Sequence, residues 1–146
     1  MKIQEQDFYH GVALTQITEH VSFKALNKAS TGNYGHYLIN TDRHVFVKYR
    51  TGGGPSWNHV FSVGELKAIE KVCDKQDLVW LALVCGGTTI CSLSKDQIHL
   101  LIDPCNHEQQ RIKIDVPYNG SCHVSGTLGK LGKVVPHNAF PARLFE

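Results

Sequence analysis

The sequence predicts an α+β, or mixed α/β, fold: a single twisted mixed sheet flanked by about three helices, with an extra C-terminal β-hairpin. Segments with helical spacing of apolar residues alternate along the chain with segments of strand character. Residues 78–85 are apolar throughout, as in a central strand that is covered on both faces. We expect one domain over residues 1–146, with a core at 5–103 and a C-terminal β extension at 104–146.

The first third of the chain predicts a helix followed by three strands. The helix covers residues 5–20, where apolar side chains recur at helical spacing. Residues 21–27 alternate weakly and suggest a first strand, and residues 30–33 have the composition of a turn. Residues 35–40 and 45–50 then predict a hairpin, because two strand-like segments flank a short polar loop.

The middle third contains two capping boxes, which predict where helices begin. A short strand at 57–61 precedes the first box, Ser62 with Glu65, and the second box is Ser94 with Gln97. In each box the serine can accept a backbone N–H of the first helical turn, and the residue three positions later can reach back.

The apolar strand 78–85 is expected to pair with residues 88–93 across the turn Gly86-Gly87. With a turn of two or four residues, Cys85 and Cys91 would point to opposite faces of the sheet and could not share a metal or a disulfide.

The last third predicts the C-terminal hairpin. Residues 111–116 alternate strictly between charged and apolar side chains, as in a strand with one face in water. Residues 121–125 can pair back on it, and the tail 134–145 is apolar enough to pack. If the protein has no nucleic-acid role, this hairpin and tail are the expected surface of a homodimer or of a complex with another protein.

Composition is that of a soluble globular protein, with 42% apolar and 19% charged residues. The formal net charge of +2 does not by itself indicate a nucleic-acid binder. Residues 1–7 lack the apolar core of a signal peptide, and no apolar run approaches the roughly 20 residues of a membrane span. We therefore expect no membrane partner. Five cysteines, an odd number, suggest reduced thiols and a cytoplasmic location.

The candidate functional segment is the hairpin strand that contains Val47-Lys48-Tyr49-Arg50. The order helix, strand, hairpin, loop, helix and central strand through residues 5–85 resembles the restriction-endonuclease-like PD-(D/E)xK superfamily. In that family the second hairpin strand carries Glu/Asp-x-Lys, and Lys48 matches the lysine. Phe46 stands where the acid would be, and residues 36–38 of the first hairpin strand contain no acid. The resemblance therefore implies a degenerate member without the standard Mg²⁺ site.

On this basis we expect a non-catalytic accessory protein with a nuclease-like core that binds nucleic acid or a protein partner. Basic groups beside aromatic rings suit a phosphate backbone and unstacked bases. The expected contacts are Lys48, Arg50, Tyr49, Arg43 and Trp57, with Lys24 and Lys28 beside them. Two structural alternatives stay open: Lys48 as an edge-strand lysine that blocks strand pairing, and Trp57 as a core anchor.

If the protein is instead a metal-dependent nuclease, its acidic ligands are displaced. Lys48 would then act with Glu19 and Asp42, with Asp7 as the alternative helix acid, and Mg²⁺ would be the cofactor. Otherwise we expect no cofactor.

A metal site built on cysteine and histidine is not expected, because Cys105 with His107 and Cys122 with His123 lack the spacing of a zinc knuckle. The same residues leave a third hypothesis open, a small-molecule binder or enzyme that uses these groups in the C-terminal third.

Overall fold

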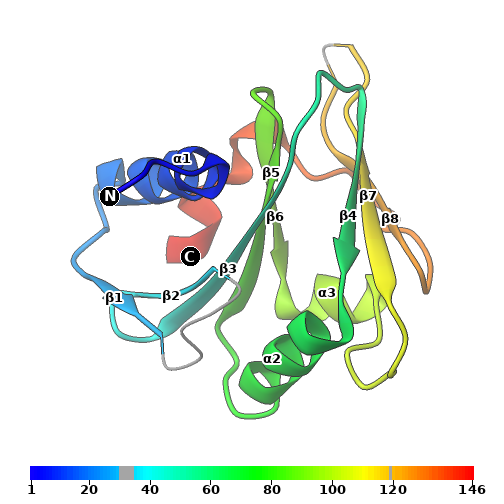
Figure 1. Ribbon diagram of the computed structural model, residues 1–146, viewed down its shortest axis with the longest axis horizontal. Helices are drawn as coiled ribbons and strands as arrows, with labels where there is room; N and C mark the ends of the chain where they lie inside the picture. Colours follow the sequence, from blue (N-terminus) through cyan, green and yellow to red (C-terminus); the bar gives the residue numbers. More distant parts are fainter. Residues whose placement is uncertain (30–34, 119) are drawn as a thin grey trace.

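The computed structural model describes residues 1–29, 35–118 and 120–146. They form a mixed α+β structure, as predicted, but with two sheets instead of one (Figure 1). The predicted turn at 30–33 lies outside the described residues. The elements in chain order are α1 (Glu5–Glu19), β1 (Leu26–Lys28), β2 (His36–Ile39), β3 (Arg43–Arg50), β4 (Ser56–Phe61), α2 (Val63–Cys73), β5 (Val79–Cys85), β6 (Thr89–Ser94), α3 (Lys95–Leu101), β7 (Gln110–Asp115), β8 (His123–Gly126), η1 (His137–Ala139) and η2 (Ala142–Phe145).

The first sheet has five strands in the order β1-β2-β3-β5-β6. β3 pairs in parallel with β5, and the other neighbours are antiparallel, so this sheet is mixed as predicted. β3 pairs with β5 over residues 44–50 but with β2 only over residues 43–46, so among the described residues Lys48 has a strand partner, Leu83, on one side only. The interpretation of Lys48 as an edge-strand lysine therefore stays a prediction.

The second sheet has three antiparallel strands in the order β4-β7-β8, and the prediction of a single sheet is wrong. β7 and β8 pair as the predicted hairpin does, but β4 from the middle of the chain joins them, with Trp57 opposite Ile114. β4 buries Trp57, His59 and Phe61 on one face. This face packs against the first sheet, so β4 belongs to a second layer and not to the same sheet.

Two cores lie on opposite faces of the first sheet. α1 and the C-terminal tail cover one face, where Ala13, Ile17, Phe140 and Leu144 are buried. The second sheet, α2 and α3 cover the other face (Figure 1). β5 is buried on both sides, as its apolar run predicts, and the tail is part of the core instead of an exposed apolar surface.

Both predicted capping boxes are confirmed. Ser62 accepts from the backbone N–H of Glu65 at 3.2 Å, and Glu65 Oε1 accepts from the backbone N–H of Ser62 at 3.3 Å. Ser94 and Gln97 do the same at α3. Within the described residues, every helix is too short or too polar to cross a membrane.

The expectation that Cys85 and Cys91 point to opposite faces is wrong. Cys85 pairs with Thr89, so the turn contains three residues, and Cys91 lies opposite Leu83. Paired residues share a face of the sheet, as do residues two apart on one strand, so Cys85 and Cys91 enter the same core. A turn of two or four residues, as expected from the sequence, would have placed the two cysteines on opposite faces.

Candidate functional site

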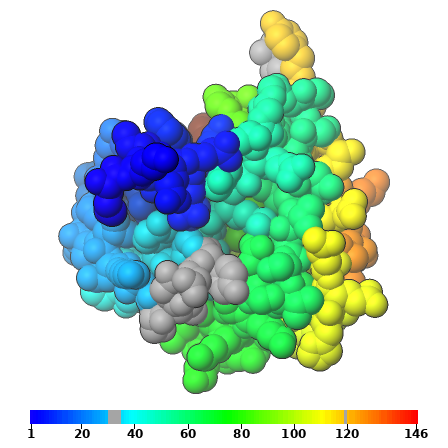
Figure 2. Space-filling model, viewed as in Figure 1, coloured from blue at the N-terminus to red at the C-terminus, as the bar shows by residue number. Residues whose placement is uncertain are grey.

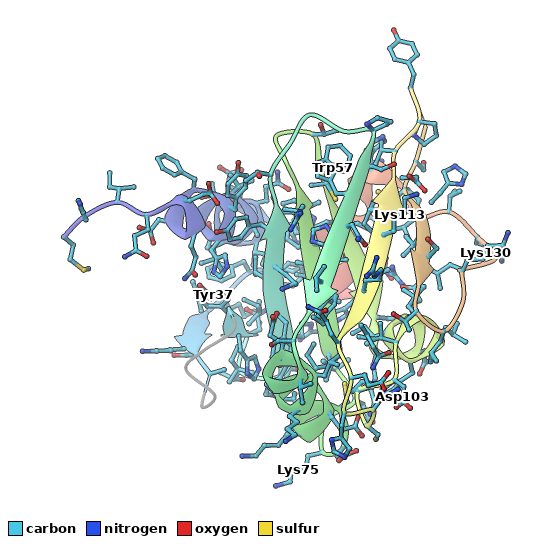
Figure 3. All side chains as sticks on the ribbon, turned by 45° about the vertical axis from the view of Figure 1, so that its right-hand side comes forward. Tyr37, Trp57, Lys75, Asp103, Lys113 and Lys130 are labelled. Carbon is cyan, nitrogen blue, oxygen red and sulfur yellow. The ribbon has the colours of Figure 1, made fainter. Side chains whose placement is uncertain are left out.

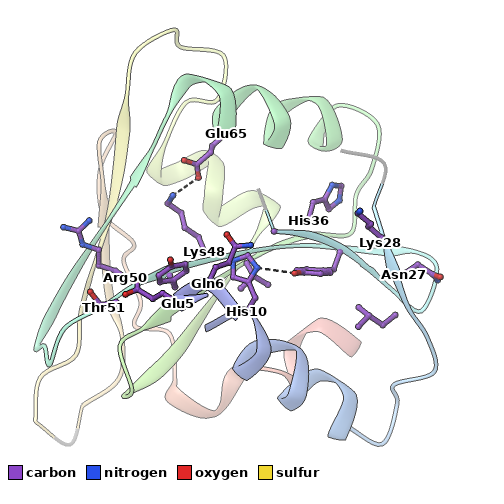
Figure 4. A pocket seen from close by; sticks show the side chains of 15 residues that line it. Glu5, Gln6, His10, Asn27, Lys28, His36, Lys48, Arg50, Thr51 and Glu65 are labelled. Carbon is purple, nitrogen blue, oxygen red and sulfur yellow. Dashed lines mark hydrogen bonds and ion pairs between the residues drawn. The ribbon is translucent and has the colours of Figure 1, made fainter. Parts of the chain in front are cut away.

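A pocket of about 1030 Å³ lies beside the C-terminal half of β3 (Figure 4). Its lining comes from the first turns of α1, from β1, from the start of β2, from residues 47–51 and from the first turn of α2. In Figure 2, α1 (blue) bounds one side of this region of the surface, and β3 with the loop after it (cyan to teal) bounds another. The charged residues of the described lining are Glu5, Lys28, Lys48, Arg50 and Glu65, three cations and two carboxylates.

Lys48 is held in the pocket wall by two partners. Its Nζ lies 2.6 Å from Glu65 Oε2 and 5.0 Å from the centre of the Phe61 ring. The side chains of Lys48 and Glu65 are 21% and 22% exposed. Strand alternation places Lys48 and Arg50 on the same side of β3. Lys48 and Arg50 therefore lie on the face of β3 that is turned toward α2 and β4.

His59 lies in the core near these two cations. The ring is 0% exposed, and its Nε2 lies 3.7 Å from Cys85 Sγ. Burial, together with the positive charges of Lys48 and Arg50, lowers the pKa of His59 to about 3. The ring is therefore neutral at pH 7, and the charges of Lys48 and Arg50 add to the larger effect of burial on its pKa.

Aromatic rings connect α1 to the strands that line the pocket. Tyr9 of α1 stacks on Tyr49 of β3, with ring centroids 4.7 Å apart and planes 6° apart. His10 Nδ1 lies 3.2 Å from the Tyr37 hydroxyl, a hydrogen bond whose direction depends on the tautomer. Burial raises the pKa of Tyr49, and the charge and hydrogen bond of Glu5 raise it further. These contacts fix Tyr37 and Tyr49 in the pocket as neutral hydroxyl-bearing rings.

A neutral histidine pair supports the far side of the pocket. His36 Nε2 lies 2.9 Å from His44 Nδ1, and the His36 ring stacks on Phe46 with centroids 4.2 Å apart. Burial lowers the pKa of His36 to about 4, with a further contribution from His44. One ring donates this hydrogen bond and the other accepts it. Protonation of both rings would remove the acceptor and place two cations in contact, which disfavours the doubly charged pair.

Three of the five predicted nucleic-acid contacts line the pocket together: Lys48, Tyr49 and Arg50, joined by Lys28. Arg43 begins β3 and pairs with Asp42 at 2.6 Å; it lies about 17 Å along the strand from Lys48. Trp57 is 2% exposed, and its Nε1 donates to the Gly52 carbonyl at 3.1 Å. The core-anchor alternative therefore describes Trp57, and this ring cannot stack on a base.

The predicted catalytic acids do not converge on Lys48. Glu19 ends α1, about 20 Å along the helix from Glu5, which lines the pocket. Asp42 lies about 20 Å along the strand from Lys48. Asp7 accepts from the backbone N–H of Gln4 and belongs to the helix cap. Among the described residues, no group of three Asp, Glu, His or Cys side chains is arranged to hold a metal ion.

Among the lining residues that sequence reasoning missed are Glu5, His10, Tyr37 and Glu65. Glu65 was expected only as a helix cap, and it performs that role with one carboxylate oxygen while the other binds Lys48. A carboxylate in the first turn of a helix that follows the hairpin is the signal that could have indicated it.

The cysteines and histidines of the C-terminal third have separate environments. Cys105 is exposed and donates to Glu70 Oε1 at 3.2 Å, whereas Cys122 is buried in the core against the thiol of Cys91. These contacts lend no support to the hypothesis of a shared cysteine and histidine site.

Comparison with protein-family models, with curated proteins and with solved structures found no match to this chain.

Proposed function

We propose that this chain is a non-catalytic accessory protein with a nuclease-like core that binds nucleic acid in the pocket beside β3. The observation that carries the proposal is that Lys28, Lys48 and Arg50 line one hollow together with Tyr37 and Tyr49. Lys28 and the two tyrosines lie on one face of the first sheet, and Lys48 and Arg50 lie on the other, so the hollow extends around β3. Cationic groups attract phosphates, and aromatic and hydroxyl groups suit bases and sugars. The order α1, β2–β3 hairpin, α2 and β5, on which the nuclease resemblance rests, supports the same proposal.

The arrangement of carboxylates favours binding over metal-dependent cleavage. Glu65, the carboxylate in contact with Lys48, is shared between a helix cap and this ion pair. Glu5 contacts Tyr49 instead of a second acid. A Mg²⁺ site with displaced ligands would need two or three oxygen ligands around one point, and Glu19 and Asp42 do not supply them.

Homodimerisation stays a prediction. The tail expected to form that surface is buried, with Phe140 at 5% and Leu144 at 1% exposure. The outer face of α1 instead exposes Phe8 and Val12, one helical turn apart.

The test is fluorescence anisotropy with single-stranded DNA, duplex DNA and single-stranded RNA, between about 50 and 200 mM salt, with and without Mg²⁺. We expect binding that weakens with salt and falls about tenfold in Lys48→Ala, a loss of about 1.4 kcal/mol. Lys113→Ala, which removes the same charge from the outer face of β7, is the matched control and should change affinity less than about twofold.

Besides an absence of binding, two results would overturn the proposal. Equal losses in Lys48→Ala and Lys113→Ala would mean that diffuse charge, not the pocket, binds the nucleic acid. Cleavage that requires Mg²⁺ and disappears in Lys48→Ala would make the protein a nuclease.

A further inference from the structure

Lys48, a cation of the proposed site, already forms an ion pair with Glu65. Glu65 is fixed by its own hydrogen bonds: Oε1 accepts from the backbone N–H of Ser62, and Oε2 accepts from Lys48 Nζ at 2.6 Å. Lys48 is also held over Phe61. Because both partners are anchored elsewhere, the pair is preformed, and an anion that enters the pocket must compete with Glu65 for Lys48.

The charge of the incoming group decides this competition. A phosphodiester carries one negative charge, so at Lys48 it would replace one monoanion with another. A terminal phosphate monoester carries about 1.5 to 2 negative charges at pH 7 and presents three acceptor oxygens. It can therefore compete for Lys48 and still attract a second cation.

Further cations are available in the same pocket. Arg50 and Lys28 line it and form no ion pair among the described residues. Arg50 is exposed at the end of β3, two residues from Lys48 on the same face. A volume of about 1030 Å³ also leaves room for a nucleoside attached to the phosphate.

We propose that the pocket recognises the terminal phosphate monoester of a nucleotide, at a strand end or on a mononucleotide, and that Glu65 determines this specificity by competing more effectively with internal phosphodiesters than with a terminal phosphate for Lys48. This inference rests on the proposed function and adds the class of ligand. A purely structural role for the ion pair, joining α2 to β3, makes a different prediction for binding, and the two can be separated.

The test uses single-stranded oligonucleotides with an internal fluorescent base, identical except for a 5′-phosphate, a 3′-phosphate or hydroxyl ends. Glu65→Gln is the informative variant because glutamine also serves at the third position of a capping box. Asp77→Asn is the matched control: it removes the same charge from a side chain that is 104% exposed. Thermal unfolding checks that both variants are folded.

We expect the wild type to prefer one phosphorylated end by about tenfold, as an extra charge in a cationic site allows. In Glu65→Gln, the affinity for the hydroxyl-ended strand should rise and the preference should shrink to about twofold. Asp77→Asn should keep the wild-type preference. Competition by a nucleoside monophosphate as strong as that of the phosphorylated strand would identify a mononucleotide as the ligand, and weaker competition would identify the strand end.

Equal wild-type affinity for phosphorylated and hydroxyl ends, with Glu65→Gln no different from Asp77→Asn, would overturn this inference while leaving nucleic-acid binding intact. Inorganic phosphate that competes as well as the nucleoside monophosphate would also overturn it, since the nucleoside would then contribute nothing. Absence of binding by every strand to every variant would instead remove the proposed function.

Discussion

The pocket beside β3 and the outer face of the three-stranded sheet are both basic, but their cations are arranged in opposite ways. On the outer face, Arg111 and Lys113 point from β7 into solvent, and Figure 3 shows Lys113 and Lys130 away from the space between the sheets where Trp57 lies. In the pocket, Lys28 of β1 and Lys48 of β3 are 20 residues apart in the sequence and line the same hollow. Convergence, more than the amount of charge, distinguishes a candidate site from a solvated face.

The largest expected effect concerns His59, which lies on the inner face of β4 and senses Lys48 and Arg50. Its pKa is about 3 in the folded state against 6.5 ordinarily, so the unfolded chain binds a proton first as pH falls. Stability is therefore fully present above about pH 6.5 and decreases toward pH 3. By about pH 4.5 the loss is about 2 to 3 kcal/mol, since each pH unit is worth about 1.4 kcal/mol.

Urea unfolding of wild type, His59→Leu and His123→Leu at several pH values measures this effect. His59→Leu should lose less stability between pH 7 and about pH 4.5. A residual slope should remain because the pKa of His36 is also lowered, to about 4. His123 is exposed on the outer face, so its variant should follow the wild type. Identical slopes for His59→Leu and the wild type would contradict the lowered pKa of His59.

The next effect in size concerns Gly35, which lies beside Val47 of β3 and His10 of α1. Its φ is +64°, and a Cβ there would lie 2.5 Å from the Val47 carbonyl oxygen and 2.7 Å from His10 Cε1. Gly35→Ala should therefore lower stability by about 2 kcal/mol and weaken binding in the pocket. Gly53→Ala is the control, because a Cβ at Gly53 has no neighbour within 4 Å. Thermal unfolding that shows equal, small losses in both would indicate that the Gly35 contact is not rigid.

The sequence predicted most of the individual elements, because caps and apolar periodicity are local signals, but the strand expected over residues 21–27 covers only Leu26–Lys28. Ser62 and Glu65 determine where α2 begins, and the apolar run before Cys85 indicates a strand buried on both faces. The pairing of β4 with β7 could not be predicted in the same way. Both strands alternate, and alternation indicates which face is buried but not which strand lies alongside.

The site was predicted in part for the same reason. Lys48, Tyr49 and Arg50 share one strand, so local sequence places them together. Glu65 meets Lys48 only because α2 packs beside β3, a contact between residues 17 positions apart. Glu19 and Asp42 were chosen from element order, which does not specify that they lie at the far ends of α1 and β3.

The most direct test of the central claim is to map the binding surface by ¹H–¹⁵N NMR during titration with a single-stranded oligonucleotide. The pocket account predicts that backbone resonances of Lys28 and of residues 48–51 shift, while those of Arg111, Lys113 and Ser125 on the outer face stay in place. Shifts confined to the outer face, with the β3 resonances unmoved, would contradict it.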